Sequence, residues 1–142
     1  MSVPERADPR PPESDGSGLE FWQGLSDGRL VLSLCRTCGQ RRFPPIESCS
    51  HCGSQAVVAA DAGGGGTVYS WATVHMPLAP EFASQAPYTV VVVDLDEGAR
   101  VFGRLLGEPG GDLAGAAVRF EPYEDHGRAL PGFRLAAAAA GR

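Results

Sequence analysis

The stretch from Cys35 to Gly53, CRTCGQRRFPPIESCSHCG, decides the fold of this chain. It holds all four cysteines of the 142-residue sequence, arranged as two Cys-x-x-Cys-Gly motifs with ten residues between Cys38 and Cys49. A Cys-x-x-Cys turn brings two thiolates together, and the glycine after each motif adopts a positive φ at little cost. Two such turns form a tetrahedral sulfur cage that suits Zn²⁺ and leaves no coordination position open. The spacing therefore predicts a structural zinc site made by Cys35, Cys38, Cys49 and Cys52.

Three other interpretations of this stretch stay open. Two disulfides would need an oxidising compartment. Iron is accepted by the same four-cysteine cage. His51, between Cys49 and Cys52, could replace one thiolate, although four cysteines already complete the shell and an exposed loop position is the simpler interpretation.

N-terminal to the cysteines, the sequence predicts an arm and one short helix. Residues 1–18 are rich in Pro, Ser and charge, so we expect a disordered arm, and their lack of an apolar core argues against a signal peptide. Ser17 and Glu20 have capping-box spacing ahead of an apolar run that includes Phe21 and Trp22, and Gly28 is expected to end the helix. Those two aromatic rings either fill the chain's own core or anchor a partner. We expect a cytoplasmic protein.

C-terminal to the cysteines, the pattern becomes all-β. Short strands separated by turn residues are typical of a small closed barrel. A strand is expected before the cysteines, at 30–34, and a weaker one after them, at 56–60. The expected barrel strands are 67–75, 88–95, 100–106, 117–123 and 132–135, with a proline-rich loop at 76–87.

Four consecutive glycines, Gly63 to Gly66, separate the two parts. No lysine follows at the spacing of a phosphate-binding loop, so we interpret residues 61–66 as a flexible joint. The expected division is a helix and ribbon at 19–62, a barrel at 63–136 and a frayed tail at 137–142. The fold class is mainly β.

Composition excludes several functions. The net charge is −5, and the twelve basic residues are all arginine. Mechanisms that need a lysine are therefore excluded. A nucleic-acid binder usually has a strongly basic surface, and here only the segment 35–66 is net positive, with three Arg against two acids. The longest apolar run is far shorter than the roughly 20 residues of a membrane span.

Arg36, Arg41 and Arg42 surround the first cysteine motif. They either offset the negative charge of a four-thiolate zinc centre or clamp the phosphate of an anionic ligand.

No catalytic set is evident in the barrel segment. Asp94 and Asp96 are interpreted as a solvated strand end that discourages edge pairing, rather than as an acid/base pair. His75 lies beside the long loop where such barrels receive ligands. Tyr69 and Trp71 share one strand face by the alternation rule, so they either pack in the core or form a stacking platform for a base.

Taken in order, these segments resemble the acyl-CoA-associated zinc-ribbon/OB-fold proteins, long catalogued as a domain of unknown function. The resemblance covers about residues 19–135. It rests on the cysteine motifs, the Phe21-Trp22 helix, Phe43-Pro-Pro45, Gly66-Thr-Val-Tyr-Ser-Trp71 and Leu130-Pro-Gly-Phe133. Residues 56–66 lack a tryptophan that many relatives have there, which leaves the angle between ribbon and barrel undefined.

The resemblance implies a rubredoxin-like ribbon, a five-stranded OB-fold barrel and a non-catalytic role beside a thiolase, acyltransferase or retro-aldolase. Some similar proteins are instead joined to hot-dog-fold enoyl-CoA hydratases. It also implies that ribbon and barrel help to complete a channel for acyl-CoA. A second hypothesis for the function is an OB-fold that binds single-stranded nucleic acid, and a third is an iron electron carrier.

Overall fold

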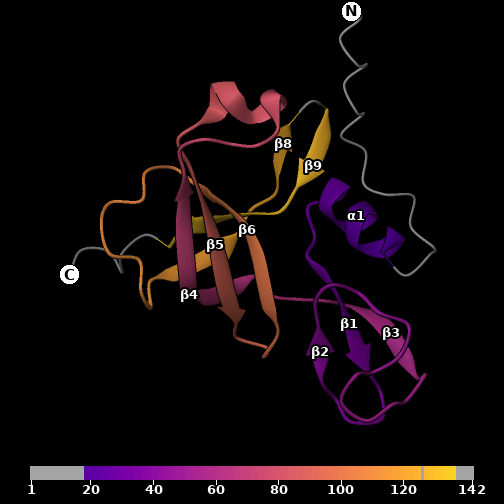
Figure 1. Cartoon of the computed structure of the whole chain (residues 1–142). Coiled ribbons are helices and arrows are strands. Elements are labelled where there is room, and N and C mark those ends of the chain that lie inside the picture. The colour runs from indigo at the N-terminus through magenta and orange to yellow at the C-terminus, as the bar shows by residue number, and fades with distance from the viewer. Residues whose placement is uncertain (1–17, 126, 137–142) are drawn as a thin grey trace, which may run out of the picture.

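The computed structural model describes residues 18–125 and 127–136. The expected N-terminal arm, except Gly18, and the expected tail at 137–142 lie outside these residues. Figure 1 shows the ribbon and the barrel side by side, with the short α-helix above the ribbon. No helix among the described residues is long and apolar enough to span a membrane.

The first part of the chain is a helix followed by a small antiparallel sheet. Helix α1 is Leu19–Ser26. The strands of the sheet are β1 (Val31–Cys35), β2 (Arg41–Arg42) and β3 (Val57–Asp61), and they lie in the order β2-β1-β3. The helix begins after Gly18 with no side-chain cap, and Ser17, which we expected to cap it, is outside the described residues. Gly28, at φ 80°, follows its end as expected.

The second part is the expected closed barrel of five strands, in the order β10-β6-β5-β4-β7. The strands at 88–95 and 100–106 alternate between buried and more exposed residues, as half-buried strands do. Parallel pairing of β10 with β6 and antiparallel pairing of β10 with β7 close it. The strands are β4 (Gly65–Val74), β5 (Tyr88–Leu95), β6 (Arg100–Leu106), β7 (Ala117–Phe120) and β10 (Gly132–Leu135).

One predicted strand is wrong in extent. The strand expected at 117–123 ends at Phe120, because Pro122 offers no N–H to continue the ladder. Tyr123–Asp125 (β8) then pairs with Arg128–Leu130 (β9), a hairpin that was not expected. A 3₁₀ helix, Pro80–Gln85, lies in the long loop before β5. The hairpin and this loop meet through a hydrogen bond of 3.2 Å from Gln85 Nε2 to Asp125 Oδ1.

The glycine run is not a flexible joint. Gly65 and Gly66 begin β4, and a Cβ on Gly66 would lie 2.5 Å from the carbonyl oxygen of Asp94. The N–H of Gly63 donates to Glu97 Oε2, and the carbonyl of Gly64 accepts from the N–H of Phe120 at 2.7 Å. Glycine is needed here because the chain runs close against the barrel.

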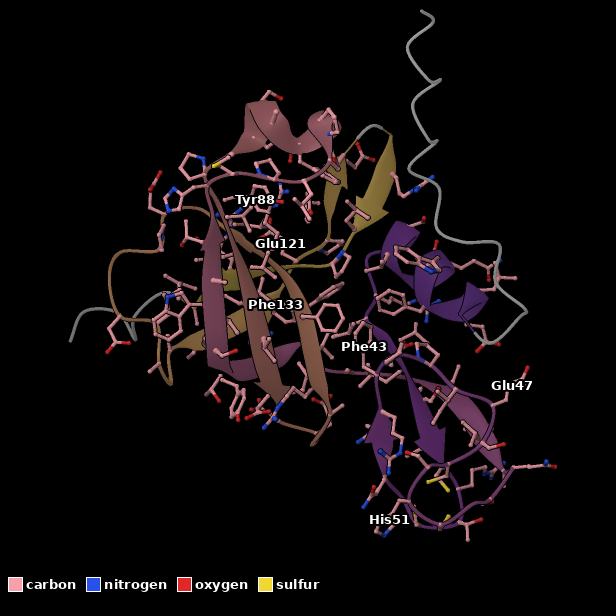
Figure 2. The ribbon with its side chains drawn as sticks, viewed as in Figure 1. Phe43, Glu47, His51, Tyr88, Glu121 and Phe133 are labelled. Atoms are coloured by element: carbon pink, nitrogen blue, oxygen red, sulfur yellow. The ribbon has the colours of Figure 1, made fainter. Side chains whose placement is uncertain are left out.

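Aromatic rings join ribbon and barrel. The Phe43 ring contacts the Phe21 ring of α1 and the Phe102 ring of β6, with centroids 5.2 and 5.1 Å apart. Figure 2 shows Phe43 between the ribbon and the barrel. One buried cluster therefore extends from the helix into the barrel, where Phe133 and Val91 are fully buried.

Candidate metal centre and ribbon–barrel cleft

The two cysteine motifs meet at the end of the ribbon that lies away from the barrel (Figure 2). All four Sγ atoms lie within 4.8 Å of one another, and the pairs Cys35–Cys52 and Cys38–Cys49 are 3.6 Å apart. A tetrahedral zinc with Zn–S bonds of about 2.3 Å needs sulfurs about 3.8 Å apart. The residues present fit that ion. The four cysteines are free, so the structure does not have the two disulfides considered above.

Backbone N–H groups stabilise negative charge on the first cysteine of each motif. The N–H of Cys38 lies 3.5 Å from Cys35 Sγ and is the main cause of a lowered pKa at Cys35. At Cys49, the N–H of Cys52, helped by the N–H of His51 and by the Arg42 guanidinium, lowers the pKa to about 6.

The second cysteine of each motif behaves in the opposite way. The N–H of Gln40 favours the Cys38 thiolate, but burial and the neighbouring thiols outweigh it and raise the pKa of Cys38 to about 11. The pKa of Cys52 is also raised. These four sulfurs would hold a divalent cation, which would neutralise their negative charge and favour loss of the thiol protons.

His51 does not belong to the sulfur cluster. Among the described residues, the metal-capable group contains the four cysteines only, and the His51 side chain is exposed. Figure 2 shows it at the tip of the ribbon. Its contribution is its backbone N–H toward Cys49.

The structure separates the three arginines predicted around the first motif. Arg41 and Arg42 form β2 and line a cleft of about 480 Å³ between ribbon and barrel, which Arg100 of β6 also lines. Arg36 is exposed and does not line this cleft. Arg42 donates to Gln40 Oε1 at 2.8 Å, and Arg100 donates to Asp94 Oδ1 at 2.6 Å. The side chain of Arg41 has no hydrogen-bond or ion-pair partner among the described residues.

Arg100 was missed by the sequence analysis, although a signal existed. The alternation of β6 turns Arg100, Phe102 and Arg104 outward, while Val101 and Leu105 are buried. Arg104 stacks on Tyr88, with its guanidinium carbon 4.2 Å from the ring centroid, and donates to Gln85 Oε1. This contact ties the long loop to the barrel.

Tyr69 and Trp71 do not share a face, and neither is a core residue. A β-bulge between Val68 and Ser70 adds one residue to β4 and reverses the alternation. Trp71 lies opposite the buried Val91, on the barrel's inner side, and is 38% exposed. Tyr69 is 58% exposed and lies under Arg100, 3.7 Å from the ring centroid to the guanidinium carbon. The prediction of a shared face was wrong because the bulge has no signature in the sequence.

The remaining predicted residues divide between core and surface. Phe21 is 4% exposed, and Trp22 is half-buried against the same cluster, so most of both rings packs inside this chain. His75 is exposed, one residue past β4. Asp94 forms a largely solvated ion pair with Arg100, and Asp96 is exposed, which agrees with the expected solvated strand end. Glu97 accepts a hydrogen bond from the linker.

The fold and the cysteine site define a class: a rubredoxin-like zinc ribbon joined to an OB-fold barrel. Family models described as the ChsH2 rubredoxin-like zinc ribbon domain and the ChsH2 C-terminal OB-fold domain match residues 22–58 and 59–121. The chain is also similar to the solved structure titled "Ltp2-ChsH2(DUF35) aldolase". That match covers 89% of this chain and 100% of the other, with 34% identity and a TM-score of 0.78. The chain belongs to the DUF35 family.

Two curated relatives carry different names. The chain is 37% identical over 104 residues to a probable enoyl-CoA hydratase alpha subunit of Thermomonospora curvata, covering 73% of this chain and 32% of that protein. It is 30% identical over 94 residues to the benzoylsuccinyl-CoA thiolase subunit BbsA of Thauera aromatica, covering 64% of this chain and 63% of that protein. The chain thus spans about a third of the first relative and less than two thirds of the second.

Proposed function

We propose that this chain is a non-catalytic accessory subunit of an acyl-CoA-processing enzyme of the thiolase superfamily, here a thiolase, acyltransferase or retro-aldolase. The observation that carries the proposal is the aldolase structure, which contains a chain that this one matches from end to end at 34% identity. The names of the three similar proteins specify an aldolase, a hydratase and a thiolase. A domain shared by three different reactions is best explained if the chemistry belongs to the partner.

The polar groups of the barrel support this role. Asp94 is paired with Arg100, and Glu97 accepts a hydrogen bond from the linker, so both acids already have partners within the chain. The cysteines are gathered in one cluster. We propose that Cys35, Cys38, Cys49 and Cys52 bind a structural Zn²⁺, with iron as the alternative, and that the metal holds the ribbon in its folded form.

We further propose that the ribbon–barrel cleft holds a phosphate of the CoA moiety in a channel shared with the enzyme. Arg41 supports this because its guanidinium is unpaired within the described part of the chain, and arginine binds phosphate through two parallel hydrogen bonds. Arg41→Gln should weaken CoA-thioester binding by the complex by roughly tenfold. Arg36→Gln, which removes the same charge outside the cleft, is the matched control and should leave binding unchanged.

The experiment that tests the accessory role is purification of the tagged chain from its own organism, with mass spectrometry of the proteins that co-purify. We expect one thiolase-like enzyme in near-stoichiometric amount and a complex that works in the cytoplasm. The purified chain should not turn over CoA thioesters, whereas adding it to its partner should raise the partner's activity. Turnover by the chain by itself, or a partner equally active without it, would contradict the proposal.

A hot-dog-fold enoyl-CoA hydratase is the second candidate partner, favoured by the 37% identity to a hydratase alpha subunit. The same purification separates the two candidates by the enzyme recovered. Binding of single-stranded DNA that falls steeply with salt would instead indicate a nucleic-acid function. We expect none, because the net charge is −5.

A further inference from the structure

Strand β4 is paired on both sides over only its first part. Its pairing with β7 covers Gly65, Gly66 and Thr67. Val68 is the last residue bonded on that side: its N–H donates to the Ala116 carbonyl at 2.9 Å, and its carbonyl accepts from the N–H of Gly115 at 3.0 Å. From there to Val74, β4 pairs with β5 only. Figure 1 shows this half of β4 rising at the side of the barrel toward the long loop.

The open side of β4 presents unpaired backbone groups. In an antiparallel ladder, successive residues turn their N–H and C=O groups to opposite sides. Val68 bonds away from β5, and the bulge after it shifts the alternation by one residue, so Trp71 and Thr73 also turn away from β5. Within the described residues, no strand or loop bonds to these two positions on that side.

This edge lacks the features that usually protect one. Exposed edge strands commonly carry charged residues that prevent pairing with other chains. Residues 62–80, which include the open half of β4, contain no Asp, Glu, Lys or Arg. Apolar side chains are exposed along the edge and just past it: Trp71 is 38% exposed, Met76 88% and Leu78 103%. Such a surface favours a covering strand.

We propose that an extended, uncharged segment of the enzyme subunit adds to this barrel as a further strand, paired with Trp71 and Thr73 of β4. Its backbone satisfies the open N–H and C=O groups, and its apolar side chains contact Trp71, Met76 and Leu78. The proposal rests on the accessory function above and names the surface through which that function operates.

A second copy of this chain fits the edge less well. If two copies paired antiparallel with Trp71 of one opposite Thr73 of the other, Met76 of each copy would lie opposite Val68 of the other. The edge of Val68 is already occupied by Gly115 and Ala116. The exposed Met76 and Leu78 would then remain uncovered in both copies, and the few residues paired would bury far less than the roughly 1,200 Å² of a stable interface.

Hydrogen–deuterium exchange of the free chain and of its complex with the co-purified enzyme tests the pairing directly. We expect the Trp71 and Thr73 amides to exchange freely in the chain by itself and at least about tenfold more slowly in the complex. A complex whose Trp71 and Thr73 amides still exchange freely would overturn the strand pairing and leave the accessory role standing. Failure to form any complex would overturn both. Slow exchange in a dimer of the chain by itself would show that a second copy is the occupant.

A proline variant gives the second test. Thr73→Pro removes the N–H that faces the open edge, whereas the N–H groups of β4 that donate to β5 remain. Thr73→Val, which keeps that N–H and loses only the hydroxyl bonded to Thr89 at 3.0 Å, is the matched control. We expect the proline variant to weaken enzyme binding at least about tenfold relative to the valine variant, with the zinc content unchanged. Equal binding by the two variants, both folded by circular dichroism, would overturn the proposal.

Discussion

The ribbon and the barrel are held together by different means. In the barrel, β5 alternates strictly, and its inward residues Val91 and Val93 are fully buried. In the ribbon, β2 has two residues, and β3 is exposed along most of its length. At the end of the ribbon away from the barrel, the buried side chains are Cys35 and Cys49 themselves. The barrel therefore depends on buried apolar area, and the tip of the ribbon depends on its ligand geometry.

This difference has a consequence for folding. Strand β1 is buried, with Val31 4% and Leu32 0% exposed, but the tip of the ribbon buries only Cys35 and Cys49, which does not offset the entropy of ordering its loops. The Phe43 ring couples the ribbon to the barrel, but it lies well away from the cysteines (Figure 2). Metal binding and barrel packing should be separable in experiments.

The largest effect is expected from removing the metal. Zinc binding in comparable peptides is worth about 10–16 kcal/mol, so Cys49→Ser or a strong chelator should unfold the ribbon while the barrel persists. Metal analysis should fall from one zinc per chain to none, and NMR should show lost dispersion for the ribbon and retained dispersion for β4 to β6.

His51→Ala is the control, because its side chain is outside the sulfur cluster. It should keep one zinc per chain. A colourless protein with zinc as the resident metal is expected. Red colour with a reversible redox band would establish iron instead, and loss of zinc in the His51 variant would make that residue a ligand.

The second effect should be confined to the barrel. Phe133 is fully buried and contacts Phe120 with ring centroids 6.0 Å apart, so Phe133→Ala should lower the free energy of unfolding by about 3–5 kcal/mol. Denaturant unfolding followed by NMR should show the barrel unfolding earlier while zinc stays bound. Release of zinc at the same denaturant concentration as barrel unfolding would show that the two parts fold as one unit.

The two parts also differ in how far the sequence predicts them. The cysteine spacing predicted the ribbon. A Val-rich run and the segment returning after the next turn predicted β5 and β6 with their observed ends, 88–95 and 100–106. Both signals are local. The hairpin of β8 and β9 was missed because three-residue strands carry too little pattern to recognise.

The errors at the surface have a common physical cause. The bulge at Tyr69 arises from pairing with β5, and the fixed position of the glycine linker arises from contact with Glu97 and Asp94. The cleft with Arg41, Arg42 and Arg100 forms only when β2 lies beside β6. Each is a tertiary contact between segments far apart in the chain, which composition and spacing do not encode.

A third prediction tests the linker. A Cβ on Gly66 would also lie 2.7 Å from Val93 Cγ1, so Gly66→Ala must shift β4 from β5 and should cost about 1–3 kcal/mol of barrel stability. Gly63→Ala is the matched control, because its Cβ would meet only Glu97 Oε2, at 3.4 Å. Thermal unfolding of the two variants should differ by several degrees, and equal unfolding temperatures would restore the flexible-joint interpretation.

The smallest effect concerns pH and separates the two parts once more. The Arg134 guanidinium donates to both carboxylate oxygens of Glu121, at 2.7 and 3.4 Å, and lowers the pKa of Glu121 below its usual 4.5. Because this pKa is lower in the folded chain than in the unfolded chain, the ion pair stabilises the barrel at pH values above the pKa of Glu121 in the unfolded chain. The stabilisation is lost as the pH falls through the pKa of Glu121 in the folded chain. Both side chains are about half exposed, so the effect is small.

Glu121→Gln should therefore lower the unfolding temperature of the barrel by about 2 °C or less at pH 7, and the difference from the unsubstituted chain should shrink as the pH falls below 4.5. The ribbon should respond to acid earlier and more strongly, because protons compete with the metal for the cysteine sulfurs. Between pH 7 and 5, zinc should dissociate while the unfolding temperature of the barrel stays constant. Parallel loss of zinc and of barrel stability over that range would show that the barrel, too, depends on the metal.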